Sequence, residues 1–468
     1  MAKQPHDMIY GIEDKPPLKE AIPLGFQQYL TMFGSTVAIP FILADALGAS
    51  PTQTAQLIGT IFFVSGIATL LQSTFGNRLP VVQGGTFSFL APTIAICGMA
   101  GISDAGFEVK MQHVQGAIIA GSLVEMLVGF TGAVGKLLRL VSPVVIAPTI
   151  ALIGLALFQF GATKAGAGAN WPIGGLTIVL IILFSQYLRK RHRVFAMYPV
   201  LLGIVGAWVT CMILSATGVF APGHAAYTDF EKVTAAPILQ VPLPFQWGMP
   251  QFATAAVVGI LAGYLASIIE SVGDYYACAR LSGAPIPTAK VVNRGIGFEG
   301  IGCFIAGIFG SGNGTTTYSE NIGAIGLTRV GSRRVIQCGA CIMIGLAVLG
   351  KFGALFSTIP QPIVGGMYCV MFGMIASVGL SNLQFVDLNS ARNLFVIGFS
   401  LFMGLSVPEY FKSLEAPLLT GSGKWLGDIL TSIGSSGMSV GAIIALFLDN
   451  TIPGTDEERG LTAWKKSA

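Results

Sequence analysis

Long apolar segments follow one another along almost the whole chain of 468 residues. A helix needs about 20 apolar residues to cross the hydrocarbon core of a bilayer. Only 10% of all residues are charged, whereas soluble domains carry about 25%. The chain is therefore predicted to be an all-α membrane protein that crosses the bilayer many times. The segments that reach the required length, or nearly so, lie at residues 22–47, 53–75, 112–134, 137–160, 171–188, 195–218, 251–279, 294–311, 335–350, 354–380, 391–407 and 434–449.

Two further segments, at residues 79–99 and 312–328, are too polar and too rich in glycine for ordinary spans. The first contains LPVVQGGTFSFLAPT, and the second follows FGSGNGTTTYS; both place β-branched and small polar residues before an apolar run. We expect each to form extended backbone followed by a half-helix. Irregular backbone is tolerated within a bilayer only where it lines a cavity or is buried in protein. With both segments counted as crossings, fourteen transmembrane segments are predicted.

The distribution of Lys and Arg residues indicates the orientation, because their excess in short loops marks the cytoplasmic side. If the N-terminus starts inside, six of the 26 Lys and Arg residues fall in outer connections and the other 20 in inner ones. Both termini are therefore predicted to be cytoplasmic, in the plasma membrane. The basic run LRKRHR (Leu188–Arg193) is interpreted as a cytoplasmic anchor rather than as a nucleic-acid site. The outer six are Lys110, Lys164, Lys232, Lys351, Lys412 and Lys424.

An internal similarity divides the chain into halves. SPVVIAPTIALIG (Ser142–Gly154) is similar to QPIVGGMYCVMFG (Gln361–Gly373), and each follows one of the irregular segments by a comparable distance. Seven crossings in each half would place the two copies in opposite orientations. Inverted repeats of this kind are typical of secondary transporters, and paired irregular segments point to the binding site.

Ionisable residues inside predicted spans are costly, which makes them candidates for function. Glu270 and Asp274 are four residues apart and share one face of a helix. Two neighbouring carboxylates raise each other's proton affinity, so a proton or a sodium ion between them would relieve the repulsion. The alternative is a pair that hydrogen-bonds to neighbouring helices. Glu125 and Glu299 are weaker candidates, and either could hold a helix–helix contact instead.

Glu320 and Asn321 begin the half-helix of the second irregular segment. Half-helices that meet in mid-membrane present free N–H groups and positive dipole ends to a ligand. A flat, polar, neutral ligand could use these N–H groups together with the carboxylate acceptors. No Ser/His/Asp set, P-loop or zinc motif can be assembled from the sequence. We therefore predict that the protein is not an enzyme, and we predict no cofactor and no metal centre with His and Cys ligands.

At this point the residues resemble a known family. SENIGAIGLTR (Ser319–Arg329) is similar to the signature of the nucleobase–ascorbate transporters, also called nucleobase:cation symporter-2. ESVGDYYACARLSGAP (Glu270–Pro285) resembles the eighth helix of that family, GFQQYLTMFGSTVAIP (Gly25–Pro40) the first, and QGGTFSF (Gln83–Phe89) the third. The resemblance extends from about residue 15 to residue 450.

The resemblance implies fourteen segments in two inverted repeats of seven, with a short strand before a half-helix in segments 3 and 10. It also implies a core domain that moves against a gate domain, and a homodimer formed through the gate domain. The boundaries expected here are a cytoplasmic tail at 1–21, core at 22–134, gate at 135–218, an extracellular loop at 219–250, core at 251–350, gate at 351–449 and a cytoplasmic tail at 450–468.

Roles for individual residues also follow from the resemblance. Glu270 and Glu320 would hydrogen-bond the substrate ring. The other implied substrate-binding residues are Thr86, Phe87, Tyr318 and Ser319: backbone near Phe87 and Ser319 would add contacts, and the rings of Phe87 and Tyr318 would pack on the ring faces.

Asp274 matches the position linked to cation coupling, and a sodium ion could bind near it. Asn321 matches the amide that braces the site. Gln28 stands where members commonly carry His, and because Gln does not titrate near neutral pH, Asp274 is the main candidate for coupling to Na+ or H+.

The first residue of the signature bears on the substrate. In the family, Glu or Gln at this position goes with nucleobases and Pro with ascorbate. A carboxylate suits the adjacent N–H donors of uracil or of a purine such as xanthine, hypoxanthine or urate, and it would repel the ascorbate anion. Cation-coupled nucleobase symport by alternating access is therefore predicted. A sodium-coupled ascorbate transporter is the second reading, because ACARLSGAP resembles the animal branch. An anion channel or exchanger is the alternative from another class.

Overall fold

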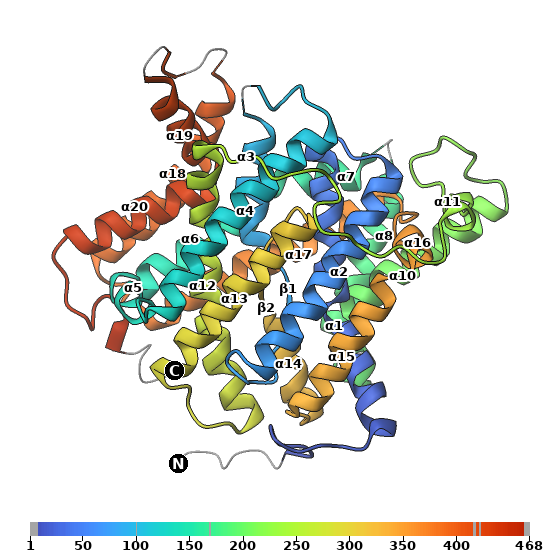
Figure 1. Cartoon of the computed structure of the whole chain (residues 1–468), viewed down its shortest axis with the longest axis horizontal. Coiled ribbons are helices and arrows are strands. Elements are labelled where there is room, and N and C mark those ends of the chain that lie inside the picture. The colour runs from blue at the N-terminus through green and yellow to red at the C-terminus, as the bar shows by residue number, and fades with distance from the viewer. Residues whose placement is uncertain (1–7, 100, 168–169, 415–417, 421–422, 463–468) are drawn as a thin grey trace.

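The computed structural model describes residues 8–99, 101–167, 170–414, 418–420 and 423–462. Helices make up nearly all of the regular structure, and they are arranged around one short pair of strands (Figure 1). The first half contains α1 (Leu18–Leu47), α2 (Pro51–Thr74), β1 (Gln83–Gly85), η1 (Phe87–Phe89), α3 (Leu90–Cys97), α4 (Phe107–Phe130), α5 (Val134–Leu140), α6 (Pro143–Leu155), η2 (Phe158–Phe160), α7 (Ala162–Ala165), α8 (Trp171–Ile182), η4 (Leu183–Tyr187), α9 (Arg193–Met197) and α10 (Pro199–Ala216).

The second half repeats this order of long helices around a strand and a half-helix. It contains α11 (Glu231–Ala235), α12 (Thr254–Ser282), α13 (Ala289–Phe309), β2 (Thr315–Thr317), α14 (Ser319–Thr328), α15 (Arg333–Ala347), α16 (Gly350–Phe356), α17 (Gln361–Ser381), η5 (Asn382–Phe385), α18 (Ala391–Lys412), α19 (Lys424–Gly434) and α20 (Gly437–Thr451).

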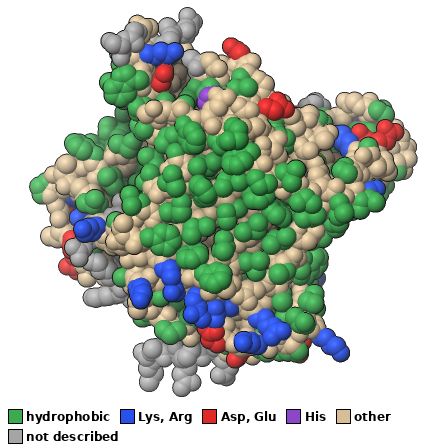
Figure 2. All heavy atoms as spheres, in the orientation of Figure 1, with side chains coloured by type: hydrophobic (Ala, Val, Ile, Leu, Met, Phe, Trp, Pro, Cys, Tyr) green, Lys and Arg blue, Asp and Glu red, His purple; other side chains and the backbone are tan. Residues whose placement is uncertain are grey.

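The apolar segments fold as the sequence predicts, into helices able to cross a bilayer. Within the described part of the chain, nine helices are long and apolar enough to span a membrane, and a tenth is formed if α19 and α20, which meet at 93°, count as one span. The all-α membrane fold is confirmed, whereas a count of fourteen crossings stays a prediction. Figure 2 shows an apolar face above a lower edge where Lys and Arg side chains gather, at the end of the molecule where α1 begins in Figure 1.

Two of the spans predicted as continuous are interrupted in the structure. The span expected at 137–160 is divided into α5 and α6, and the one at 354–380 into α16 and α17. Proline lies at both breaks, with Pro143 and Pro362 in the first turn of the following helix. Proline fits the first helical turn but cannot donate the backbone hydrogen bond that a continuous helix requires.

The two similar segments of the halves pack against each other through α6 and α17. A Cβ atom added at Gly154 would lie 2.3 Å from the carbonyl oxygen of Phe372, and one added at Gly379 would lie 2.2 Å from the backbone nitrogen of Ala151. Glycine is therefore required for the approach of these two helices, because any side chain would collide with backbone. Small residues at such contacts are typical of helix pairs in membranes.

β1 and β2 pair in antiparallel fashion in the middle of the bundle (Figure 1). The register joins Gln83 to Thr317, Gly84 to Thr316 and Gly85 to Thr315, and all six residues are buried. The threonines of β2 favour extended backbone. Gly84 is needed because its Cβ would lie 2.6 Å from the Tyr318 ring. Since the strands run in opposite directions, α3 and α14 leave the pair toward opposite ends of the molecule.

A buried ion cluster joins the end of α20 to neighbouring elements. The Asp449 carboxylate accepts hydrogen bonds from the guanidinium groups of Arg392 (3.0 Å) and Arg459 (2.7 Å) and from the Ser142 hydroxyl (2.8 Å). These contacts connect the start of α6, the start of α18 and the segment after α20. Removing one member of a buried charge cluster leaves the other charges without a partner.

Asp449→Ala is therefore expected to destabilise the protein by about 3–5 kcal/mol, measured as a lower midpoint of thermal unfolding of the purified protein in detergent. Glu409→Ala serves as the control, since it removes only the exposed pair with Lys412 and exposed pairs contribute about 0–1 kcal/mol. Equal midpoints for the two variants would contradict the stabilising role of the cluster.

Candidate functional site

The antiparallel pair of β1 (Gln83–Gly85) and β2 (Thr315–Thr317), here called the crossing, directs the first turns of two half-helices to one place. Thr86 caps the first, since its Oγ1 accepts a hydrogen bond from Ser88 N (3.2 Å), and its own N–H donates to Asn313 Oδ1 (2.7 Å). The second half-helix, α14, begins after Tyr318, and no side chain caps its N-terminus within the described chain. Its first N–H groups and the positive end of its dipole therefore remain available to a ligand.

Three acidic side chains from α12 and α14 converge beside this junction. Asp274, which is 8% exposed, accepts hydrogen bonds from the Ser319 hydroxyl to Oδ1 (2.8 Å) and Oδ2 (3.0 Å). Glu270 is half-buried one turn earlier on α12, close enough to Asp274 and Glu320 for their charges to interact. The structure thus brings together the residues that the sequence pointed to, although Glu270 and Glu320 are 50 positions apart in the chain.

Glu320 lies on an exposed face of α14 and is held from α1. Its Oε1 accepts a hydrogen bond of 2.7 Å from the Ser35 hydroxyl. The exposed residues of this half-helix continue from Ser319 and Glu320 through Gly323, Gly326 and Leu327. They run from the crossing toward the end of the molecule that carries the Lys and Arg side chains of Figure 2. The site is therefore accessible from that end along α14.

Gln28 and Asn321 form a direct contact. The Asn321 side-chain amide, which is fully buried, donates to the Gln28 carbonyl oxygen (2.8 Å) and to Gln28 Oε1 (2.9 Å). An amide side chain at position 28 can accept this bond at any pH, which a titrating imidazole could not. Gln28 thus fixes the start of α14 without itself carrying a proton.

The two aromatic candidates occupy different environments. Phe87 is partly buried and meets the ring of Phe372 on α17 edge to face, with 6.1 Å between ring centroids. Tyr318 is only 4% exposed; its hydroxyl donates to the Gly85 carbonyl (2.7 Å) and accepts from Thr36 Oγ1 (3.1 Å). The Phe87 ring therefore lies where a ligand could meet it, whereas in this structure the Tyr318 ring packs under β1 and its hydroxyl supports the crossing.

Glu299 is placed more centrally than the sequence suggested. Its carboxylate is 1% exposed and lies behind the crossing, where it accepts hydrogen bonds from a set of hydroxyl groups. The donors are Ser267 (3.0 Å), Ser271 (2.7 and 2.8 Å), Tyr275 (3.2 Å), Thr316 (3.4 Å) and Thr317 (3.5 Å). A signal for it was present: Ser267, Ser271 and Tyr275 recur every four residues, on a face of α12 other than the one that carries Glu270 and Asp274.

Glu125 is the opposite case. It is 1% exposed, yet neither carboxyl oxygen receives a hydrogen bond from an N–H or O–H group of the described residues. It lies on α4 near Glu299 and Cys303 of α13. An ionised carboxylate without a donor is costly in such surroundings, so the geometry favours the neutral acid at Glu125 beside an ionised Glu299. No cluster of three or more His, Cys, Asp or Glu side chains suited to a metal ion occurs in the described part.

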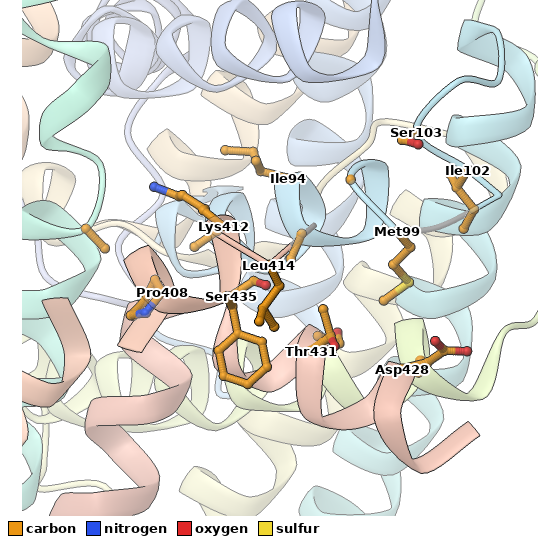
Figure 3. A pocket seen from close by; sticks show the side chains of 18 of the residues that line it. Ile94, Met99, Ile102, Ser103, Pro408, Lys412, Leu414, Asp428, Thr431 and Ser435 are labelled. Carbon is orange, nitrogen blue, oxygen red and sulfur yellow. The ribbon is translucent and has the colours of Figure 1, made fainter. Parts of the chain in front are cut away.

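A crevice of about 950 Å³ opens at the other end of the molecule (Figure 3). Ile94 and Met99 reach it from α3 and the segment after it, Pro408 and Lys412 from α18, and Thr431 from α19. Its lining includes Ala91, one helical turn beyond Phe87 on the half-helix. The crevice therefore separates α3 and the start of α12 from the ends of α6 and α18.

Comparison with known proteins agrees with this arrangement. A model described as a permease family matches residues 19–413. Solute carrier family 23 member 2 of Mus musculus is 49% identical over 99% of this chain and 77% of its own length. Nucleobase-ascorbate transporter 2 of Arabidopsis thaliana is 40% identical over 99% of this chain and 93% of its own. The transmembrane domain of the cyanobacterium bicarbonate transporter BicA superposes with a TM-score of 0.58 over 84% of this chain and 97% of that one; at 14% identity, it shows a shared fold.

Glu299→Gln is expected to destabilise the protein, because an amide offers one acceptor oxygen in place of two and brings two new donors among hydroxyl donors. Hydrogen bonds to a charged group contribute about 1.5–3 kcal/mol each, so a loss of about 2 kcal/mol or more is expected in thermal unfolding. Glu125→Gln is the matched control on the neighbouring helix, since its carboxyl group accepts no hydrogen bond from an N–H or O–H group of the described residues. If both variants unfolded at the wild-type temperature, the hydrogen bonds from the hydroxyl groups to Glu299 would have no stabilising role.

Proposed function

Because this chain belongs to the permease family and is therefore a multi-pass membrane transporter, we propose that it carries a nucleobase together with a cation. The observation that supports the nucleobase is the position of Glu270 and Glu320 beside the uncapped start of α14. A nucleobase carries N–H donors and carbonyl acceptors in one plane. The carboxylates would accept from its N–H groups, and the backbone N–H groups of α14 would donate to its carbonyl oxygens.

The charge of the site argues for a neutral ligand. Asp274, Glu270 and Glu320 lie together, none of them forms an ion pair with a Lys or Arg of the described residues, and the half-helix α14 adds the positive end of its dipole. A monoanion such as ascorbate would be repelled by these three carboxylates unless a cation bound together with it. Sodium-coupled ascorbate transport is kept as the second candidate, since relatives at 38–40% identity are named nucleobase-ascorbate transporters. An anion channel or exchanger, suggested by the fold shared with BicA, would need a less acidic site.

Asp274 is the proposed coupling residue. Its carboxylate lies one helical turn from Glu270, and both of its oxygens contact the Ser319 hydroxyl. A proton or a sodium ion at Asp274 would reduce the repulsion between the carboxylates, and so favour ligand binding beside Glu270. Such coupling is reciprocal, because each ligand changes the affinity for the other by the same factor.

In the proposed alternating-access mechanism, one domain of the fold moves against the other. In the proposal, the core (residues 22–134 and 251–350) carries the crossing and slides against the gate (135–218 and 351–449). Phe87 and Phe372 would then move apart, since they lie on opposite sides of this boundary. The accessible face of α14 favours a state open toward the end with the Lys and Arg side chains, which we propose is the cytoplasmic side of the plasma membrane. A homodimer formed through the gate belongs to the same proposal.

Glu320→Gln is expected to retain the fold and to weaken nucleobase uptake by about 10- to 100-fold, the loss expected for one hydrogen bond to a charged acceptor. The measurement is uptake into proteoliposomes of labelled uracil, xanthine, hypoxanthine, urate and ascorbate. Glu409→Gln, at an exposed position, is the control. Unchanged nucleobase uptake by the Glu320 variant would remove this residue from the site, and uptake of ascorbate alone by wild type would favour the second candidate.

Asp274→Asn is expected to abolish accumulation of the nucleobase against a gradient, because an amide neither takes up a proton nor binds Na+ strongly. Exchange of substrate between the two sides should persist, since the amide also removes the repulsion with Glu270. Proteoliposomes under separate sodium and proton gradients distinguish the two ions. Concentrative uptake by this variant would refute the coupling role.

A further inference from the structure

Helix α1 holds the start of α14 through three side-chain contacts. Gln28 accepts from Asn321 at 2.9 Å, Ser35 donates to Glu320 at 2.7 Å, and Thr36 donates to Tyr318 at 3.1 Å. Each partner, the N-cap residue Tyr318 and then Glu320 and Asn321 of α14, is fixed by a separate side chain of α1. Of the three contacts, the Ser35 contact alone reaches a side chain that is exposed at the site.

The Ser35 hydroxyl divides the two oxygens of the Glu320 carboxylate into different roles. Oε1 receives the hydroxyl proton, whereas Oε2 receives no hydrogen bond from the described residues. Ser35 itself is 6% exposed, so it acts on a ligand through Glu320 rather than by contact. Oε2 is therefore the oxygen of Glu320 that keeps both lone pairs free for a ligand.

We propose that Ser35 is a positioning residue that leaves Oε2 as the preferred acceptor of Glu320, and thereby sets the preference for a ring whose N–H lies alone between carbonyl groups. This inference rests on the proposed function, since it takes Glu320 as the contact to the base. Uracil and xanthine present such an N–H. Guanine presents two adjacent donors, N1–H and the 2-amino group, which match a carboxylate with both oxygens free.

The geometry of the two oxygens explains the expected selectivity. A free carboxylate binds two parallel N–H donors, one on each oxygen, as in bidentate pairs. With one lone pair of Oε1 taken by Ser35, the second donor of guanine would have to share that oxygen with the serine hydroxyl and would make a weaker hydrogen bond. Without the Ser35 hydroxyl, both oxygens could turn to the ligand.

The test is competition binding to purified full-length protein, with labelled uracil displaced by unlabelled xanthine or guanine. Ser35→Ala is expected to weaken uracil binding about tenfold, the equivalent of about 1.4 kcal/mol, and to shift the guanine-to-uracil affinity ratio toward guanine by about tenfold. In proteoliposomes, KM for uracil should rise while kcat changes little, because only ligand positioning is altered. Ser35→Thr, which keeps the hydroxyl, should restore the wild-type ratio.

Thr31→Val is the matched control, one turn earlier on α1, because the Thr31 hydroxyl donates to Gln27 O within its own helix. It should leave the affinity ratio unchanged. If Ser35→Ala does not fold, Ser35→Cys, whose thiol is a weak donor of similar size, gives the same comparison.

An unchanged ratio in folded Ser35→Ala or Ser35→Cys, or an equal shift in Thr31→Val, overturns this inference while the nucleobase function stands. If wild-type protein binds none of the bases, the proposed function fails and the inference fails with it. The wild-type measurement thus separates the two results.

Discussion

The pairing of β1 with β2 is the interaction on which the rest of the site depends. A chain that breaks two helices inside a bilayer must satisfy the freed backbone groups within the protein. The antiparallel register from Gln83 with Thr317 to Gly85 with Thr315 supplies those hydrogen bonds. Because the pairing is antiparallel, α3 and α14 start beside each other and leave in opposite directions, and their N-termini share one centre.

A polar layer behind the strands supports this centre. The Glu299 carboxylate collects the hydroxyl groups of α12 and β2, and Gln83 reaches Thr317 across the pair at 2.7 Å. The same helix, α12, presents Glu270 and Asp274 on another face. The buried Glu299 carboxylate thus helps to fix the position of the site carboxylates relative to β2, because its hydroxyl donors lie on both α12 and β2.

Local features of the sequence were enough to predict much of this arrangement. The length of the apolar segments predicted the membrane spans. The segments at 79–99 and 312–328, which are rich in glycine and small polar residues, predicted the broken helices. The four-residue spacing predicted that Glu270 and Asp274 share one helix face. Prolines at 143 and 362 could have predicted the interrupted spans. The spacing of Ser267, Ser271 and Tyr275 indicates a polar face of α12, but only the fold shows that Glu299 of α13 lies against that face and that the Tyr318 ring is buried.

The sequence by itself determined the membrane class, the two irregular segments and the resemblance to a transporter family, since each follows from residue types within a short window. Only the tertiary structure decided which hydroxyl serves which carboxylate. Ser35 and Glu320 are 285 residues apart, and Gln28 and Asn321 are 293 apart. No periodicity links such positions; they meet because the crossing of two strands places the start of α14 against the middle of α1.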